Sequence, residues 1–243
     1  MAIHVVILEF SIAMRRFVIG DIHGAYKALI QCLERAQFDY NADLLICLGD
    51  VCDGWPETRE AVDELLKIKN LIFILGNHDY WTLEYAKTDT INPTWLRSGG
   101  DNTLNSYNDI IPEDHIALFE NAELYFELDG KLFVHAGIEI GIPIEKQGPD
   151  VFLWDRSLFR EAIAQYEAGI NEKLTPFTET YIGHSPIHSM GYTRPILAGD
   201  VWLMDTGAVW DGVLSLLDID SKEVYCSDHV NTLYPPDSGR QRF

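Results

Sequence analysis

LLICLGDVCDGW, residues 44–55, is an uninterrupted apolar run that ends in two carboxylates. Residues 44–48 do not alternate between apolar and polar side chains, which is typical of a strand buried on both faces. The run closes on Gly49-Asp50, and a second carboxylate, Asp53, follows immediately before Gly54. Because binding sites in parallel sheets lie beyond the carboxyl ends of the strands, this pattern indicates a functional loop.

Two similar runs flank this one, RFVIGD at 16–21 and NLIFILGN at 70–77. Between the three runs, residues 24–37 and 57–69 carry apolar side chains at helical spacing, and Pro56 suits the first turn of the second helix. The order strand–helix–strand–helix–strand predicts a parallel sheet whose polar strand ends share one crevice.

The second half of the chain is richer in strands. Residues 122–137 alternate around an Asp-Gly pair, which predicts a hairpin, and residues 156–169 have helical spacing. Further short strands are expected at 179–184, 201–207, 212–220 and 223–227. We therefore predict an α/β fold that becomes α+β in its second half, with two mixed sheets packed as a sandwich and helices outside.

The charge balance and the cysteine content argue against some classes of function. Of 243 residues, 18 are basic and 38 acidic, and the net charge of -20 argues against a nucleic-acid-binding face. It does not exclude an anionic substrate, because a bound metal reverses the sign of the local charge. The four cysteines show no C-x-x-C spacing and are interpreted as reduced thiols in a cytoplasmic protein. We find no membrane-spanning segment in the sequence.

Chemically active side chains cluster at the predicted strand ends. A single such motif would more often be structural, because aspartate commonly caps a helix, but five of them in one chain indicate a site. Carboxylates, imidazoles and an amide without thiolate suit Mn²⁺, Fe or Zn²⁺, and the donors are too numerous for one four-coordinate ion. Two ions sharing Asp50 would use them. The residues concerned are Asp21, His23, Asp50, Asn77, His78, His135 and His184. The remaining histidines, His4, His115, His188 and His229, are interpreted as surface or loop residues.

The motifs GDIHG, GDVCD, GNHD, HAG and GHSP resemble, in order, the signature blocks of calcineurin-like metallophosphoesterases. WLRSGGDNTLNSY (95–107), FLWDRSLF (152–159) and DTGAVWDGVLSLLDI (205–219) are similar to accessory blocks of the bacterial phosphoprotein phosphatase branch. The resemblance implies a four-layer αββα fold. From the residues we expect 1–13 to be an extension or extra strand, 14–230 a single domain and 231–243 a C-terminal tail, in which YPPDSGRQRF (234–243) is typical of a loose end.

The same resemblance implies a role for each matching residue. Asp21 and His23 would bind a first metal, Asp50 would bridge, and Asn77, His135 and His184 would bind a second. His78 would be the general acid with Asp53 behind it, and Arg156 and Asn77 would bind the substrate phosphate.

The implied activity is phosphomonoester hydrolysis of the protein serine/threonine phosphatase type. A hydroxide held between two divalent metals would attack the phosphorus in line, and Mn²⁺ is the metal expected there. Two departures keep a symmetrical diadenosine tetraphosphate hydrolase or a phosphodiesterase open as the alternative. First, Gly54 stands where the family has a phosphate-binding arginine, and Arg59, Arg97 or Arg194 could take the place of that arginine. Second, Asp79 follows His78 where many protein phosphatases have glutamate. A non-catalytic module is disfavoured, because no expected ligand is lost.

Overall fold

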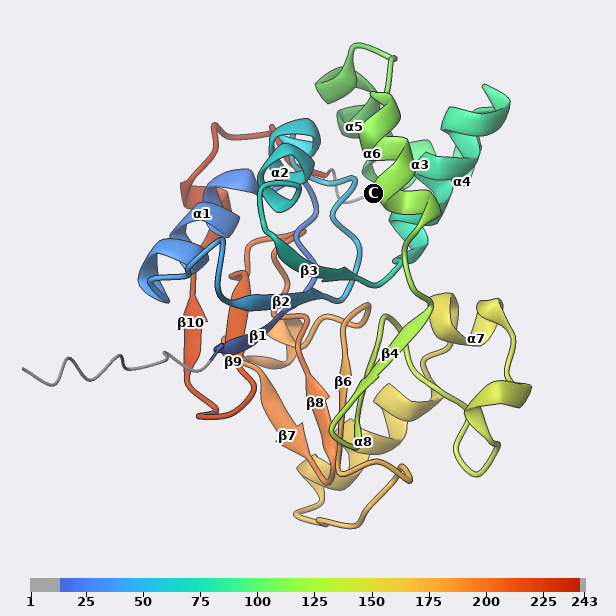
Figure 1. The fold of residues 1–243 in the computed structure, drawn as a ribbon, viewed down its shortest axis with the longest axis vertical. Helices are drawn as coiled ribbons and strands as arrows, with labels where there is room; N and C mark the ends of the chain where they lie inside the picture. The colour runs from blue at the N-terminus through green and yellow to red at the C-terminus, as the bar shows by residue number, and fades with distance from the viewer. Residues whose placement is uncertain (1–13, 241–243) are drawn as a thin grey trace, which may run out of the picture.

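A computed structural model describes residues 14–240, which form two five-stranded sheets facing each other. Figure 1 shows the first sheet with α1 and α2 on its outer side. In spatial order, its strands are β10 (Val224–Cys226), β9 (Ser215–Asp218), β1 (Arg16–Ile19), β2 (Leu44–Cys47) and β3 (Asn70–Phe73). The three predicted runs at 16–21, 44–50 and 70–77 are thus adjacent strands, and β1, β2 and β3 pair in parallel as expected.

The crossover helices α1 (Tyr26–Arg35) and α2 (Thr58–Leu65) confirm the two predicted helical segments. The placement of Pro56 in the first turn of α2 was wrong, because that helix begins at Thr58. Residues 55–57 are instead tied to the first loop of the sheet: the Trp55 amide donates to the His23 carbonyl and the Glu57 amide to the Gly24 carbonyl. These bonds hold the segment out of the helix.

The second sheet contains the predicted hairpin and the two strands predicted at 179–184 and 201–207. Its order is β4 (Tyr125–Leu128), β5 (Lys131–Val134), β6 (Glu179–Ile182), β8 (Val201–Leu203) and β7 (Ile196–Ala198). β4 and β5 are antiparallel around Asp129-Gly130, and both turn residues have positive φ. β5, β6 and β8 pair in parallel. β7 was not predicted.

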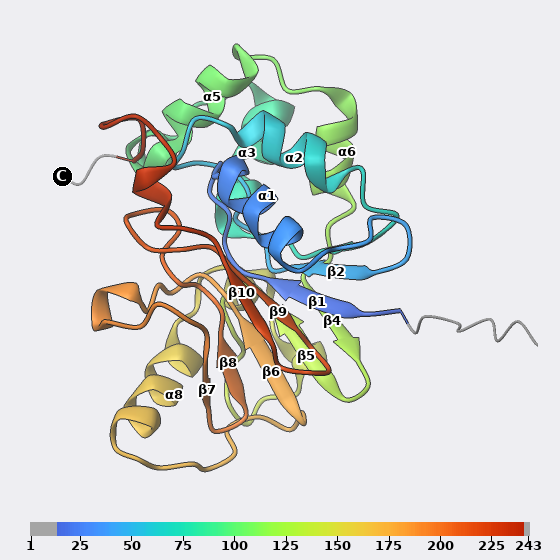
Figure 2. The ribbon, with the colours of Figure 1, turned by 90° about the vertical axis from the view of Figure 1, so that its left-hand side faces the viewer.

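The side chains of β2 explain why its sequence has no alternation. Leu44 and Ile46 belong to the cluster between the sheets, and Leu45 and Cys47 belong to the cluster beneath α1 and α2. Both faces are therefore buried. On the other side of the sandwich, α7 (Pro149–Trp154) and α8 (Ser157–Glu167) contribute to a third apolar cluster with the second sheet. Figure 2 shows the resulting order of helix, sheet, sheet and helix, which confirms the predicted architecture.

A helical insertion between β3 and β4 was not anticipated. It consists of α3 (Asn77–Thr88), α4 (Pro93–Trp95), α5 (Asp101–Tyr107) and α6 (Glu113–Glu120). It has its own apolar cluster around Trp95 and Tyr107. His115 lies inside this insertion rather than at the surface, 1% exposed, with its ring bonded to the Tyr107 hydroxyl and to Asp63.

The ends of the chain differ from expectation where the structure describes them. Residues 1–13 and the expected extra strand lie outside the described residues. The loose tail was a wrong expectation for residues 231–240, because Tyr234 is buried and its ring stacks on Trp55. Cys32, Cys47 and Cys52 are buried free thiols, as predicted. Over the described range, no helix has the length and apolarity needed to cross a membrane.

Candidate active site

Five loops meet at one edge of the sandwich, each following a parallel strand of one of the two sheets. The loops after β1, β2 and β3 carry Asp21, Asp50 and Asn77, and those after β5 and β6 carry His135 and His184. Because parallel strands end at the same edge, both sheets direct these side chains to a common place. All five residues are at most 7% exposed.

The backbone of this edge is strained where functional side chains leave it. His23, Asp50, Asp53 and His184 all have positive φ, between 50° and 69°. Only a few per cent of residues other than glycine adopt this conformation, although aspartate and histidine tolerate it better than most. Such strain persists where surrounding contacts fix the backbone, and it is concentrated at functional sites.

Two of the glycines at the strand ends are needed because another loop packs directly against them, and not because of their backbone conformation. A Cβ at Gly76 would overlap the Asp50 backbone nitrogen and its Oδ1, and a Cβ at Gly183 would overlap Asp21 Oδ1. Neither glycine has positive φ. The glycine in each motif therefore allows one loop to lie against the carboxylate of another.

The first group of donors surrounds His23. Its Nε2 lies 3.9 Å from Asp21 Oδ2 and 3.7 Å from Asp50 Oδ2. Its Nδ1 lies 3.0 Å from the Cys52 carbonyl, which can only accept a hydrogen bond. The proton is therefore on Nδ1, and Nε2 presents its lone pair toward the two carboxylates, as a metal-binding histidine does.

The second group surrounds His135. Its Nδ1 donates to the Leu48 carbonyl at 2.8 Å, and its Nε2 lies 3.4 Å from Asp50 Oδ2 and 3.0 Å from Asn77 Oδ1. His184 Nε2 is buried and has no hydrogen-bond partner among the residues that the structure describes. A buried polar atom without a partner is costly, which indicates a ligand here.

The two groups share Asp50 and fit a pair of cations. Donor atoms of His23, Asp50 and His78, and separately of Asp50, His135 and His184, lie within 4.8 Å of one another. Asp21 adjoins the first group through its contact with His23. All donors are oxygen or imidazole nitrogen, a set that suits Mn²⁺, Fe or Zn²⁺.

Electrostatics also favour bound cations. Burial, followed by the charges of Asp205 and Asp50, raises the pKa of Asp21 well above its usual range. Burial lowers the pKa of His23 to about 3 and that of His184 to about 2, so both rings are neutral. Crowded carboxylates facing neutral imidazoles leave uncompensated negative charge, which a divalent cation would offset.

His78 and Asp53 form a separate pair beside these groups. His78 Nδ1 lies 2.5 Å from Asp53 Oδ2. Asp53 is fully buried and also accepts hydrogen bonds from Trp95 Nε1 at 2.9 Å and from the Thr103 hydroxyl at 2.7 Å. Burial lowers the pKa of His78, but the charges of Asp50 and Asp53 and the bond to Asp53 raise it above its usual value. Asp53 thus orients the His78 ring through Nδ1 and favours its protonated form.

Two carboxylates of the site were missed by sequence reasoning. Asp79 accepts from the backbone amides of Val51 (2.9 Å), Cys52 (3.1 Å) and Gly76 (3.1 Å), so it braces the loop between Asp50 and Asp53. Asp205, 3% exposed, lies near Asp21 and has a pKa raised to about 7, first by burial. Its position directly after an apolar run, in DTG, is the same signal that the other motifs gave.

The predicted phosphate-binding arginine also reaches the site. Arg156 Nε donates to the Ser185 hydroxyl at 3.2 Å, one residue beyond His184. Its side chain is exposed, but partial burial of the guanidinium lowers its pKa, while the nearby charges of Asp50 and Asp205 raise it. Arg156 is therefore a cation beside the cluster that remains open to solvent.

The three arginines considered as substitutes at Gly54 are all exposed. Arg59 pairs with Asp63 at 4.0 Å, and Arg194 donates to the Val224 carbonyl. Arg97 contacts the Thr94 hydroxyl and lines a pocket of about 140 Å³ that Arg240 also lines. Of the three, only Arg97 shares a pocket with Arg240. The sequence analysis did not consider Arg240.

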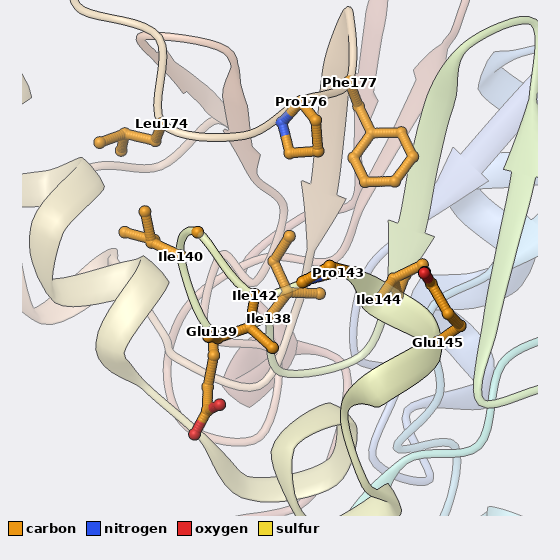
Figure 3. A pocket seen from close by; sticks show the side chains of 11 residues that line it. Ile138, Glu139, Ile140, Ile142, Pro143, Ile144, Glu145, Leu174, Pro176 and Phe177 are labelled. Carbon is orange, nitrogen blue, oxygen red and sulfur yellow. The ribbon is translucent and has the colours of Figure 1, made fainter.

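A separate apolar pocket of about 580 Å³ lies over the loop that follows His135 (Figure 3). Isoleucines of the 138–144 loop face Leu174, Pro176 and Phe177 across it. None of the site residues described above lines this pocket. Its volume therefore does not identify the site, which is defined by the converging polar side chains.

Comparison with known proteins agrees with this geometry. Residues 14–195 match the calcineurin-like phosphoesterase family. The chain is 26% identical over 208 residues to serine/threonine-protein phosphatase 1 of Salmonella typhimurium, covering 84% of this chain and 91% of that one. It is 24% identical over 273 aligned positions to the symmetrical bis(5'-nucleosyl)-tetraphosphatase of Neisseria gonorrhoeae, covering 87% and 94%.

Among solved structures, a crystal structure of a candidate diadenosine tetraphosphatase has the same fold, with a TM-score of 0.64 at 17% identity over 89% of this chain and 94% of that one. The match of the family to three quarters of the sequence agrees with the order of the motifs and with the two-sheet sandwich. The chain belongs to the calcineurin-like phosphoesterase family and is a hydrolase.

Proposed function

We propose that this hydrolase is a metal-dependent phosphomonoesterase of the protein serine/threonine phosphatase type. The observation that carries the proposal is the His78–Asp53 pair, 2.5 Å apart, beside two groups of ligand atoms that share Asp50. A buried proton donor next to a site for two cations is the arrangement that phosphoester hydrolysis needs. The match to a protein phosphatase over 91% of that protein's length supports the substrate class.

The proposed metal centre takes two divalent ions. Asp21 and His23 would hold one, Asn77, His135 and His184 the other, and Asp50 both. We favour Mn²⁺ over Fe or Zn²⁺, because oxygen and imidazole donors without thiolate suit it. Bound there, such ions lower the pKa of water and stabilise charge on phosphoryl oxygens.

The remaining steps belong to side chains of the protein. Arg156 and the Asn77 amide bind the phosphoryl oxygens and orient the phosphorus for in-line attack. His78 gives a proton from Nε2 to the departing alkoxide oxygen. Asp53 accepts the Nδ1–H bond throughout, which fixes the ring and favours its protonated form. The chain needs no covalent phosphoenzyme.

A symmetrical dinucleoside tetraphosphatase is a second candidate. The gonococcal relative of that name is matched over 94% of its length, and Asp79 stands in the motif where many protein phosphatases carry glutamate. In this protein Asp79 faces backbone amides rather than open space, so its identity affects loop geometry more than substrate contact. The cytoplasmic location and the absence of a nucleic-acid partner stay predictions from composition.

The test is a side-by-side assay of the purified chain on a phosphoseryl peptide, diadenosine tetraphosphate and bis-p-nitrophenyl phosphate, each with Mn²⁺, Zn²⁺ or Mg²⁺. The proposal expects the highest kcat/KM on the phosphopeptide and loss of activity in EDTA. A preference for the dinucleotide would establish the second candidate, and hydrolysis that persists without any metal would contradict both.

A further inference from the structure

The C-terminal segment, residues 231–240, lies against the loop that contains Asp53 and Gly54. The ring of Tyr234 stacks on Trp55 with centroids 4.9 Å apart, and its hydroxyl donates to Glu57 Oε2 at 2.6 Å. The same hydroxyl accepts from the Lys27 amide at 3.1 Å. The segment is therefore anchored to the first sheet's loops and helices.

Its last residues come closer still to the site. The Asn102 side-chain amide of α5 donates both to the Gly54 carbonyl at 2.5 Å and to the Ser238 carbonyl at 3.1 Å. A Cβ at Gly239 would lie 2.8 Å from ring atoms of Trp55, so a side chain there would force the segment away. Figure 2 shows this segment, drawn in red, rising to α5.

Arg240 follows immediately. Its guanidinium lies over the Trp210 ring, 4.9 Å from the ring centroid, and the residue is half-buried. It lines two pockets, of about 390 and 140 Å³, which Gly239 also lines. A guanidinium stacked on an indole keeps its hydrogen-bonding edge available, and such a planar edge matches phosphate oxygens.

The charges of Arg240 and Arg156 act on different parts of the site. Asp53 and Asp50 are the carboxylates whose charges act on Arg240. Those that act on Arg156 are Asp50, Asp205 and Asp21. Asp50 is common to both sets, so its charge acts on both guanidiniums.

The backbone around Asp53 cannot supply a cation itself. Gly54 has a φ of +90°, and a Cβ there would lie 3.0 Å from the His23 carbonyl and 3.1 Å from Val209 Cγ2. A charged side chain on the His78 side must therefore come from another part of the chain. The anchored segment places Arg240 in the pocket that Gly99 and Asn102 also line, and both of these residues are hydrogen-bonded to Gly54.

We propose that Arg240 binds the substrate phosphoryl group beside the loop of Asp53 and Gly54, so that the C-terminal segment forms one wall of the substrate site. This inference rests on the proposed function. The competing interpretation is that Arg240 only fastens the segment through its contact with Trp210, in which case its loss would affect stability and not phosphate binding.

The test compares Arg240→Ala and Arg240→Lys with Arg194→Ala, which removes the same charge from an exposed arginine that bonds to the Val224 carbonyl and lines neither pocket of Arg240. We expect Arg240→Ala to lower kcat/KM by about 10- to 100-fold and to weaken inhibition by inorganic phosphate by a similar factor. Arg240→Lys should recover part of both losses, and Arg194→Ala should match the unaltered protein.

Binding of inorganic phosphate, followed as the shift in Tm that it causes, gives a readout that does not need turnover. The inference predicts a smaller shift in Arg240→Ala than in Arg194→Ala. Equal shifts and equal inhibition constants would overturn it, as would a lower Tm without any change in phosphate binding. If the unaltered chain hydrolyses no phosphoester, the proposed function fails, while the phosphate-binding comparison still decides the role of Arg240.

Discussion

Replacing His78 by alanine should separate proton donation from metal binding. Asp53 holds the His78 ring at 2.5 Å and is itself fixed by Trp95 and Thr103, so the donor is oriented before substrate arrives. A pre-oriented general acid contributes about 10²–10⁴-fold, and we expect a loss of about 10³-fold in kcat on a phosphoseryl peptide. On p-nitrophenyl phosphate, whose leaving group needs no proton, the loss should stay within about tenfold.

The assay is steady-state kinetics on both substrates, together with metal analysis of each purified protein. His78→Asn is the matched variant, because it keeps a polar side chain facing Asp53 but cannot donate a proton as an acid. Equal losses on the two substrates would refute the role of His78 as a general acid. Loss of metal in His78→Ala would show that His78, which lies within the group formed with His23 and Asp50, is a ligand instead.

Three further changes test the structure around the site. Gly183→Ala would overlap the Asp21 carboxylate, so metal analysis should show a metal content below that of the unaltered protein; full occupancy would contradict the close packing. Trp95→Phe removes the indole donor from the buried Asp53 carboxylate, which keeps only its bonds to Thr103 and His78, and should reduce the free energy of unfolding in urea by about 1–3 kcal/mol; no change would mean that water replaces the indole. Burial raises the pKa of Glu179, but bonds from Lys222, Trp202 and Tyr181 bring it below its usual value. Its contribution is thus present above the unfolded pKa of about 4.3 and lost as pH falls through the folded pKa, so Glu179→Gln should lose less stability than the unaltered protein as the pH falls below about 4.3, by up to about 1 kcal/mol after solvent screening. Parallel acid denaturation curves would contradict this assignment.

The strands could be predicted because their runs are apolar on both faces. β1, β2 and β3 each end in glycine and a polar residue, and that combination located the loops of the site. Parallel pairing then followed from the intervening helices. The gathering of Asp21, Asp50 and His184 at one edge is a consequence of that topology, which is why sequence reasoning could reach it.

The helical insertion could not be predicted in the same way. α3 begins at Asn77 within the GNHD motif, and its apolar and polar residues are not segregated clearly on two faces, so no helix was predicted there. The small cluster around Trp95 forms only when four short helices fold together. The indole that bonds to Asp53 was therefore interpreted as a packing residue or a pocket residue, with no role assigned.

The position of the C-terminal segment could not be predicted for a different reason. YPPDSGRQRF carries no periodicity, and its prolines and glycine are typical of a chain end. Its place depends on single contacts with distant residues, such as the stacking of Tyr234 on Trp55 and the bond from Asn102 to Ser238. Contacts of this kind leave no local signal, so Arg240 was not considered as a site residue.

The proposed pair of metal ions depends most on Asp50, the carboxylate that both groups of ligand atoms share. The most direct measurement is the number of metal ions per chain in Asp50→Asn, set beside the unaltered protein and His184→Ala. We expect about two ions in the unaltered protein, a loss of one ion in His184→Ala and a loss of both in Asp50→Asn. Retention of both ions by Asp50→Asn would contradict a shared carboxylate, and a single ion in the unaltered protein would contradict the pair.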